Sequence, residues 1–355
     1  MLIILDEETL LKAVGDRNVV KKQNATIYDV ANRVGVSLAT VSRVVNGNKN
    51  VRDSTKEKVL KAIDELGYQP NAVARGLASK KSTTIGIVMP DVTNLYYAEL
   101  TRGINDVANM YHYDVLLTNT DDDPVRDVLA INSLESKQVD GIIFMGNELD
   151  QGVRKTIDAL NIPVVLAGCV DAQQKLPSVN IDYIDAFYEI TASLLRHGHE
   201  NVALVMGSLD EAINRDYRLA GYTKALNEVG RQVDEKLLFT TGRDYQKTLE
   251  LAPKVVASGA TAMIVYDDVV AVALLNYLHD HHFDLPGQME LVTSNDTNYS
   301  IISRPQLTSI AQPKYDIGAV AMRMLTKLMN NEDLKEQAVK LPHTIVQRQT
   351  THELN

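Results

Sequence analysis

The side chains best suited to hold a ligand by hydrogen bonds stand close together near the start of the chain. Side chains with hydroxyl or amide groups lie on both sides of Arg43 in the sequence, at Thr26, Ser37, Thr40, Ser42 and Asn46. Hydroxyls and amides donate hydrogen bonds to phosphate oxygens, and an arginine can donate two to the N7 and O6 atoms of a guanine. This combination of donors indicates a surface that binds nucleic acid.

A second group of charged residues lies near the other end of the chain. Asp316, Arg323 and Lys327 are 7 and then 4 positions apart, so on a helix they share one face. Arg323 can hold a phosphoryl group through paired hydrogen bonds, and Lys327, one turn further on, adds positive charge. Ion pairs on a solvated helix have the same spacing, which leaves both interpretations open.

Two short helices joined by a tight turn must position the first group of donors. Apolar residues at positions 27, 30, 31 and 34 predict one helix, which ends at Gly35. Ser37 caps a second helix, whose inner face carries Val41, Val44 and Val45. The polar residues of that helix then point outward, as in a helix-turn-helix unit, although a plain helical hairpin inside a larger fold has the same pattern.

A third helix is predicted to complete this unit. Ser54 and Glu57 have the spacing of a capping box, and Gly67 is a stop signal. The apolar residues between them are expected to close a three-helix core: Val59, Ile63 and Leu66.

Charge is divided unevenly along the chain. The 355 residues carry a net charge of −10, which taken alone argues against a polyanion-binding protein. Residues 21–81, however, hold 12 Lys and Arg against 5 Asp and Glu, a net charge of +7, so the remainder carries −17. A basic head on an acidic body indicates nucleic acid at one end of the molecule.

After residue 82 the pattern changes to apolar runs that alternate with amphipathic segments. Seven runs predict buried parallel strands, at residues 83–90, 113–120, 140–146, 163–168, 201–207, 261–266 and 290–296. Strands that alternate with helices in this way indicate a doubly wound α/β fold.

The body carries no strong catalytic or metal-binding pattern. It contains no Walker loop, dinucleotide glycine fingerprint, HExxH or GxSxG motif, so the sequence does not indicate an enzyme. The cluster at 279–282 (His, Asp, His, His) falls at the polar end of a predicted helix, and the aspartates at 121–123 precede a helix, where capping is favoured over cation binding. The single cysteine, Cys169, excludes an intrachain disulfide and a cysteine-cluster zinc site.

The first residues do not form a secretory signal. Five apolar residues open the chain and three acidic residues follow, whereas a signal peptide needs a basic start and a longer apolar run. No later apolar run approaches the roughly 18 residues of a membrane span. We therefore expect a cytoplasmic protein with a disordered extension over residues 1–23.

Two segments resemble the DNA-binding head and hinge of the lactose-repressor family: TIYDVANRVGVSLATVSRVVNG at 26–47 and YQPNAVARGLASK at 68–80. The resemblance implies a helix-turn-helix domain over 24–68 and a hinge over 69–82 that folds on the operator, where Leu77 wedges into the minor groove. The DNA-binding residues that it implies are Thr26, Tyr28, Ser37, Leu38, Ala39, Thr40, Ser42, Arg43, Asn46, Asn71, Ala74 and Leu77.

The same resemblance implies that residues 83–355 form a two-lobed regulatory domain like a periplasmic binding protein. Its N-lobe would comprise 83–182 and 312–339, and its C-lobe 183–311 and 340–355, with an effector cleft between them. Arg218, Asp268 and Asn295 match cleft positions of the family. Asn295 stands where the family usually has an aspartate, which argues against a conventional sugar pocket.

Residues 304–330, together with 90–115 and 137–145, are similar to the branch of the family that controls carbon catabolism in low-GC Gram-positive bacteria. The likeness implies a homodimer on a palindromic operator, with the phosphocarrier HPr, phosphorylated on a serine, as corepressor, and glycolytic phosphosugars as further candidate ligands. The corepressor-binding residues that it implies are Asp91, Asp106, Tyr111, Tyr315, Asp316, Arg323 and Lys327.

Two alternatives stay open. One is a regulator of the same fold that answers a small sugar or phosphosugar in the cleft. The other is a solute-binding protein of a transport system, which shares the two-lobed fold but would need a secretory signal and no DNA-binding head. An enzyme that acts on sugars is a more distant third.

Overall fold

In the computed structural model, the chain divides near residue 80 into two units, each with its own core. The structure describes residues 25–45, 50–68, 81–146 and 149–354. None of the helices in these ranges is long and apolar enough to cross a membrane.

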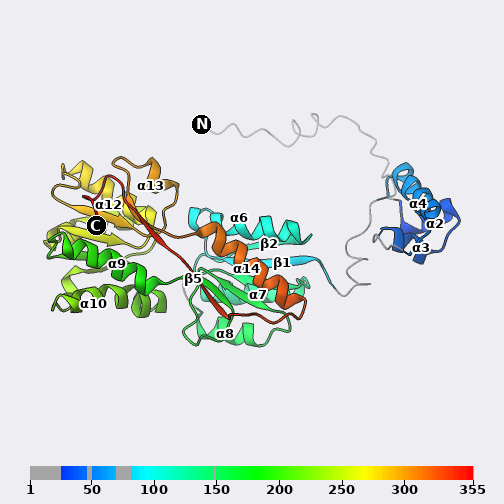
Figure 1. Ribbon diagram of the computed structural model, residues 1–355, viewed down its shortest axis with the longest axis horizontal. Coiled ribbons are helices and arrows are strands. Elements are labelled where there is room, and N and C mark those ends of the chain that lie inside the picture. Colours follow the sequence, from blue (N-terminus) through cyan, green and yellow to red (C-terminus); the bar gives the residue numbers. More distant parts are fainter. Residues whose placement is uncertain (1–24, 46–49, 69–80, 147–148, 355) are drawn as a thin grey trace, which may run out of the picture. The chain divides into compact units, whose positions relative to one another are not determined.

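The first unit contains three helices, α2 (Ile27–Val34), α3 (Leu38–Val45) and α4 (Asp53–Leu66) (Figure 1). Thr26 and Asp29 form a capping box at the start of α2, and Gly35, with φ of +71°, ends the helix as predicted. Gly67 likewise ends α4 in the left-handed conformation. The capping box predicted at Ser54 is wrong, because α4 already begins at Asp53 and its cap position is Arg52, whose side chain makes no capping hydrogen bond.

A small apolar core joins these three helices. Its fully buried members come from all of them: Val30, Ala31, Val41, Val44, Val59 and Ala62. Ile63 and Leu66, which the sequence placed in this core, pack against it while half-buried. The inner face of α3 is therefore committed to the core, and its other face is free to meet a ligand.

The second unit contains two six-stranded sheets. The first has the order β11-β5-β4-β3-β1-β2, and its strands are β1 (Thr84–Met89), β2 (Asp114–Asn119), β3 (Gly141–Phe144), β4 (Val164–Ala167), β5 (Ser178–Ile181) and β11 (Ala338–Leu341). The second has the order β12-β10-β9-β8-β6-β7, and its strands are β6 (Val202–Met206), β7 (Leu238–Thr240), β8 (Ala262–Val265), β9 (Glu290–Thr293), β10 (Thr308–Ala311) and β12 (Thr344–Val346). All neighbouring strands are parallel except β10 and β12.

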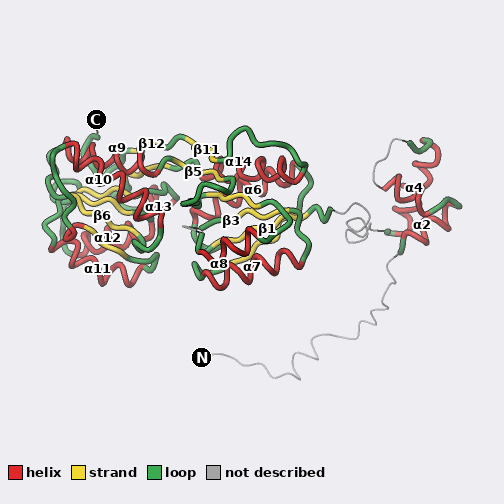
Figure 2. The backbone as a smooth tube through the Cα atoms, turned by 90° about the horizontal axis from the view of Figure 1, so that it is seen from below, coloured by secondary structure: helices red, strands yellow, loops and turns green. Residues whose placement is uncertain are grey.

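Helices cover both faces of each sheet, so each sheet and its helices form one lobe (Figure 2). In the first lobe α6 (Leu95–Met110) and α14 (Lys314–Met329) lie on one face, and α7 (Pro124–Ser136) and α8 (Gln151–Asp158) on the other. In the second lobe α9 (Tyr183–Arg196) and α10 (Leu219–Glu228) pair on one face, and α11 (Tyr245–Ala257) and α12 (Asp268–Asp280) on the other. The short elements η1 (Ile213–Arg218), η2 (Glu235–Leu237) and α13 (Asn298–Ile302) complete the second lobe.

The chain passes between the sheets three times, after β5, after β10 and after β11. The first passage leaves β5 and enters the second lobe through α9, and the other two leave β10 and β11. In the first sheet the passages therefore lie at the edge opposite β2, and in the second sheet those at β10 and β12 lie near the edge opposite β7. β11 spans residue 339, at which the sequence placed a lobe boundary, and it pairs with β5 up to Leu341.

One strand departs from the expected pattern. β2 pairs with β1 in parallel as predicted, but it is an edge strand with both faces largely uncovered, and Leu116 and Leu117 are 37% and 40% exposed. The apolar run in the sequence does not reveal that β2 is exposed, because a strand at the edge of a sheet can have the same apolar residues as a buried strand.

Candidate nucleic-acid and partner-binding surfaces

The outer face of α3 and the residues just before it form the candidate nucleic-acid surface. Ser37 starts the helix by accepting a hydrogen bond from the backbone N–H of Thr40, at 3.2 Å. Leu38, Ala39 and Arg43 are exposed, and Thr40 and Ser42 are half-buried. Within residues 25–45 and 50–68, Arg43 has no carboxylate at ion-pair distance, so its guanidinium is available to an external acceptor.

The start of α2 contributes two further residues. The Asp29 carboxylate accepts hydrogen bonds from the backbone N–H and from the hydroxyl of Thr26, both at 2.7 Å, and these bonds lower the pKa of Asp29. Thr26 is thus already used as a helix cap. Tyr28 is 63% exposed and presents its ring to solvent. The remaining predicted DNA contacts fall outside the described residues: Asn46, Asn71, Ala74 and Leu77.

The second candidate surface is the pair of helices α6 and α14. Two glycines let their backbones touch: a Cβ added to Gly318 would lie 2.0 Å from the carbonyl oxygen of Leu100, and one added to Gly103 would lie 2.0 Å from that of Tyr315. No other residue type fits at either position without moving a helix. The outer residues of the two helices therefore form one continuous surface.

Six of the seven predicted corepressor residues are exposed on this surface or at its margin. The Tyr315 hydroxyl donates to the Asp106 carboxylate at 3.1 Å, and this hydrogen bond raises the pKa of Tyr315. Within the described ranges the others are exposed and their side chains make no hydrogen bond or ion pair: Tyr111, Asp316, Arg323 and Lys327. Two neighbouring cations with no counter-ion among the described residues suit an external anion.

Two more charged residues, Asp91 and Arg102, lie on the loop before α6 and on α6 itself. The carboxylate of Asp91, on the loop before α6, accepts hydrogen bonds from the backbone N–H and the hydroxyl of Thr93, at 2.8 and 2.7 Å. Asp91 thus already shapes its own turn. Arg102 is exposed on α6, and its charge acts on Tyr315. Sequence reasoning missed Arg102, because only the packing of α6 on α14 brings it to this surface.

The cleft between the lobes is nearly filled by the chain's own side chains. Its cavity has a volume of only about 20 Å³, enough for about one water molecule. Arg218 lies in its wall, donates to Asn214 at 2.7 Å and places its guanidinium 5.4–5.8 Å from the ring centres of Tyr183, Phe187 and Tyr266. This conformation has no space for a sugar.

The three predicted cleft residues do not all line that cavity. Arg218 and Asn295 do, together with four tyrosines and Arg243, none of which the sequence singled out. Asp268 does not, because its buried carboxylate accepts hydrogen bonds from the hydroxyl of Thr293 at 2.5 Å and from the N–H of Thr297 at 2.7 Å. Asp267, one residue earlier, lines the cavity in its place.

Within the acidic and histidine clusters, Asp121, Asp123 and His281 serve local structure. Asp123 accepts a hydrogen bond from Val125 as the cap of α7, as the sequence predicted, and Asp121 pairs with Arg126. His281 stacks on Tyr277 just after α12, with ring centres 3.9 Å apart. Across the part of the chain that the structure describes, no three His, Cys, Asp or Glu side chains are placed to hold a metal ion.

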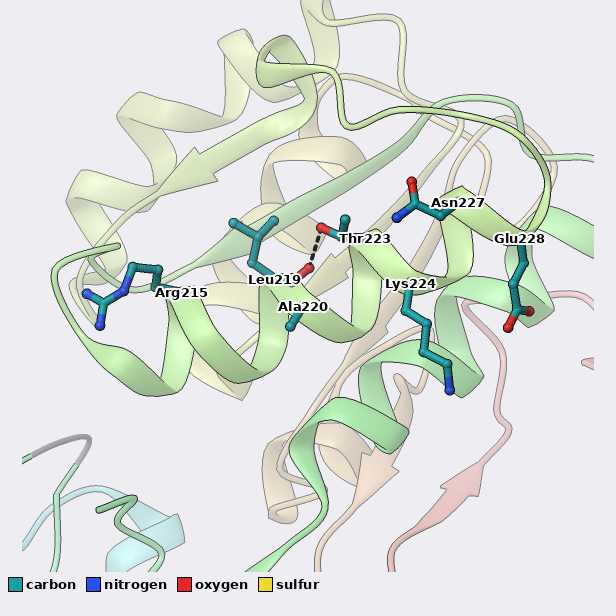
Figure 3. Close-up of a pocket in the computed structure, with 7 residues that line it drawn as sticks. All are labelled: Arg215, Leu219, Ala220, Thr223, Lys224, Asn227 and Glu228. Atoms are coloured by element: carbon teal, nitrogen blue, oxygen red, sulfur yellow. Dashed lines mark hydrogen bonds between the residues drawn. The ribbon is translucent and has the colours of Figure 1, made fainter. Parts of the chain in front are cut away.

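A shallow hollow on the outer face of η1 and α10 is lined by Arg215, Leu219, Ala220, Thr223, Lys224, Asn227 and Glu228 (Figure 3). Its charged groups already have partners. Arg215 pairs with Asp216 at 2.8 Å, the Lys224 ammonium lies 4.0 Å from the ring centre of Tyr188, and the hydroxyl of Tyr188 donates to Glu228 at 2.7 Å. The three charged side chains of the hollow are therefore already engaged within the lobe.

Comparison with known protein families matches both units. Residues 26–71 match bacterial regulatory proteins of the lacI family, and residues 82–349 match the periplasmic binding proteins and sugar binding domain of the LacI family.

Individual relatives cover almost the whole chain. Catabolite control protein A of Streptococcus mutans is 50% identical over 92% of this chain and 98% of its own length, and that of Priestia megaterium is 45% identical over 92% and 99%. Among solved structures, the transcription regulator CcpA of Lactococcus lactis has a TM-score of 0.73 at 39% identity, over 76% of this chain and 99% of its own. A lac repressor dimer bound to operator has a TM-score of 0.81 at 27% identity, over 93% and 99%.

Proposed function

Because this chain belongs to the LacI family of bacterial regulatory proteins, we propose that it controls genes of sugar catabolism by binding palindromic operators as a homodimer, with serine-phosphorylated HPr as its corepressor. Family membership makes it a DNA-binding transcription regulator. The observation that carries the rest is a pair of cations on the surface of α6 and α14, Arg323 and Lys327, which have no counter-ion in the part of the chain that the structure describes.

The head reads the operator through α3. Arg43 is exposed and has no ion-pair partner among the described residues of the head, so it can make two hydrogen bonds to a guanine in the major groove, worth about 1–3 kcal/mol of discrimination. Leu38 and Ala39, exposed at the start of the helix, offer apolar contact to thymine methyl groups. The hydroxyls of Ser37, Thr40 and Ser42 suit phosphates, which fix the register of the head on DNA.

A single head covers only a half-site, so a palindrome needs two chains. The edge strand β2 supports self-association because it leaves Leu116 and Leu117 uncovered, and the neighbouring helix α7 exposes Val125 and Leu129. An exposed apolar edge of this kind is stabilised by a partner that buries it. A two-fold axis through this region would present the same surface from both chains.

The corepressor docks on α6 and α14. Arg323 receives the phosphoryl group on the HPr serine through a bidentate contact, and Lys327, one helical turn away, adds a second charge. Asp106, Asp316 and Asp91 then face basic residues of the partner. Docking favours DNA binding only if HPr binds the DNA-competent arrangement of the two chains more tightly than the other, and DNA must in turn favour HPr by the same factor.

A small-molecule effector in the cleft is the weaker alternative. The cavity holds about one water molecule, and Asn295, whose amide replaces the usual aspartate, already donates to Asp267 at 3.4 Å. A sugar would therefore have to open the cleft and break internal contacts before it could bind.

Fluorescence anisotropy on a labelled palindrome with a central CG step tests the proposal. We expect the full chain to bind alone, and to bind more tightly when serine-phosphorylated HPr is added. Unphosphorylated HPr is the matched control and should leave the affinity unchanged. Equal affinity with and without the phosphorylated partner would reject the corepressor, and a gain with a phosphosugar instead would favour the effector alternative.

A further inference from the structure

Arg243 connects the two lobes across the cleft, on the side where β2 and β7 lie. It lies in the second lobe, on the loop between β7 and α11. Its Nη1 donates to the Asp122 carboxylate at 2.7 Å, and its Nη2 donates to the Tyr97 hydroxyl at 3.1 Å; both partners belong to the first lobe. The guanidinium also lies 5.4 Å from the centre of the Tyr97 ring.

The second lobe holds Arg243 in place for these contacts. Asp267, at the start of α12, has its Oδ2 atom 3.4 Å from the Nε atom of Arg243. The Oδ1 atom of the same carboxylate accepts from the backbone N–H of Val269, so Asp267 is itself fixed to its helix. The side chain of Arg243 is only 19% exposed, and it is therefore oriented by its own lobe before it meets the other.

The position of this contact makes it effective against separation of the two lobes. The three chain passages between the lobes lie at the β5, β11, β10 and β12 edges, whereas Asp122 follows β2 and Arg243 follows β7 at the opposite edges. When two bodies turn about a hinge at one edge, their surfaces separate most at the far edge. A contact there resists opening more effectively than a contact of equal strength beside the hinge.

Lys314 supplies a second contact, close to the hinge. It is the first residue of α14, is 6% exposed, and donates to the backbone oxygens of Asn295 and Asp296 at 2.7 and 2.8 Å. Glu99 of α6 lies 3.5 Å from the same ammonium group. The lobes are thus joined on both sides of the cleft by charged groups of the chain itself.

We propose that Arg243, with Asp122 and Tyr97, is an intramolecular latch that holds the two lobes closed without a small-molecule ligand. The latch takes the place of the effector that closes a two-lobed binding protein. Its consequence for DNA rests on the proposed function: the regulatory domain stays in one closed form, and the docking of a partner on α6 and α14 remains as the controlling event.

Distances between spin labels on the full chain test the latch. Labels at Asn132→Cys on α7 and Glu250→Cys on α11 report the separation of the lobes, since both sites are exposed and Cys169 is buried away from the reagent. Dilution with unlabelled chain removes distances between subunits. We expect one short distance in the wild type with no ligand added.

Arg243→Gln and Asp122→Asn, one in each lobe, should each add a longer distance. A roughly tenfold rise in the ratio of open to closed molecules corresponds to about 1.4 kcal/mol. Arg231→Gln is the matched control, because Arg231 pairs with Glu200 inside the second lobe, and it should leave the distance unchanged. An unchanged distance in both latch variants, or a broad distribution in the wild type, would overturn the proposal. The measurement involves neither DNA nor HPr, so its failure is separate from a failure of the proposed function.

Discussion

The close contact of α6 and α14 yields a prediction whose size follows from the structure. A Cβ placed on Gly318 lies 2.0 Å from the carbonyl oxygen of Leu100, whereas carbon and oxygen approach no closer than about 3.3 Å. Gly318→Ala must therefore move α14 away from α6 by about 1.3 Å. Neither helix can yield locally, because the atom in the way belongs to the backbone.

The displacement should reduce both stability and partner binding. Overpacking costs about 3 kcal/mol at a rigid site, and the better helix propensity of alanine returns about 1, which leaves a loss of about 2 kcal/mol. That loss lowers the thermal midpoint by about 4 °C for a domain of this size. The hydrogen bond from Tyr315 to Asp106, now 3.1 Å, would exceed hydrogen-bond length, and we expect an approximately tenfold weaker affinity for phosphorylated HPr.

Scanning calorimetry and titration with phosphorylated HPr measure the two effects. Gly242→Ala is the matched control, since an added Cβ there meets no atom within 4 Å. Gly103→Ala should behave like Gly318→Ala, and the double variant should cost less than the sum of the two, because one displacement relieves both clashes. A midpoint within about 1 °C of the wild type in Gly318→Ala would refute the reasoning.

Four further predictions concern DNA, the corepressor and pH. Arg43→Ala should weaken operator binding by about 1–3 kcal/mol in anisotropy and relax the preference at one base pair, and equal loss on every sequence would assign Arg43 to phosphates instead. Leu77→Ala should weaken operator binding and leave the sedimentation coefficient of the homodimer unchanged; full affinity would exclude the wedge. Arg323→Ala should lower the affinity for phosphorylated HPr in calorimetric titration, while its affinity for operator alone stays constant. Burial works to raise the pKa of Glu290, but His199 and His352 outweigh it and hold the pKa at about 2. The ionised Glu290 therefore stabilises the fold fully above pH 4.5, and this stabilisation is lost as the pH falls toward 2. Glu290→Gln should lower the free energy of unfolding at pH 7 by on the order of 2 kcal/mol. In the variant, the urea concentration at the unfolding midpoint should fall less steeply between pH 4.5 and pH 2 than in the wild type.

The architecture of the body could be predicted from its apolar runs, within limits set by strand length. All seven predicted strands are present, and six of them contain four or five consecutive buried residues, whereas β2 is the exposed edge strand. β5, β7, β10, β11 and β12 were not predicted, since each contains polar residues that interrupt or shorten its apolar run. The exposure of β2 depends on which strand lies beside it, and strand order is a property of the whole sheet.

The sequence could likewise predict some features of the candidate surfaces and not others. Spacing alone placed Arg323 and Lys327 on one helix face, because that relation is local. It could not bring Arg102 or Asp106 beside Tyr315, since that depends on the contact made by Gly103 and Gly318. The cleft was the hardest to predict, because Asp267 is the extended cap residue of α12 and lies in the wall, whereas Asp268 is the first residue of the helix and lies in the interior.

One helix connects the partner surface to the junction of the lobes. α14 presents Arg323 and Lys327 to solvent, and at its first residue Lys314 donates to backbone oxygens of the second lobe. α14 is packed on α6 through backbone contact at Gly103 and Gly318, so we expect the two helices to shift together. Any movement that a partner imposes on its outer face must therefore reach the interlobe contact of Lys314, while the Arg243 latch resists opening at the far edge. We therefore expect the cleft to stay closed, and the side of the molecule that carries α14 to be the part that moves when a partner binds.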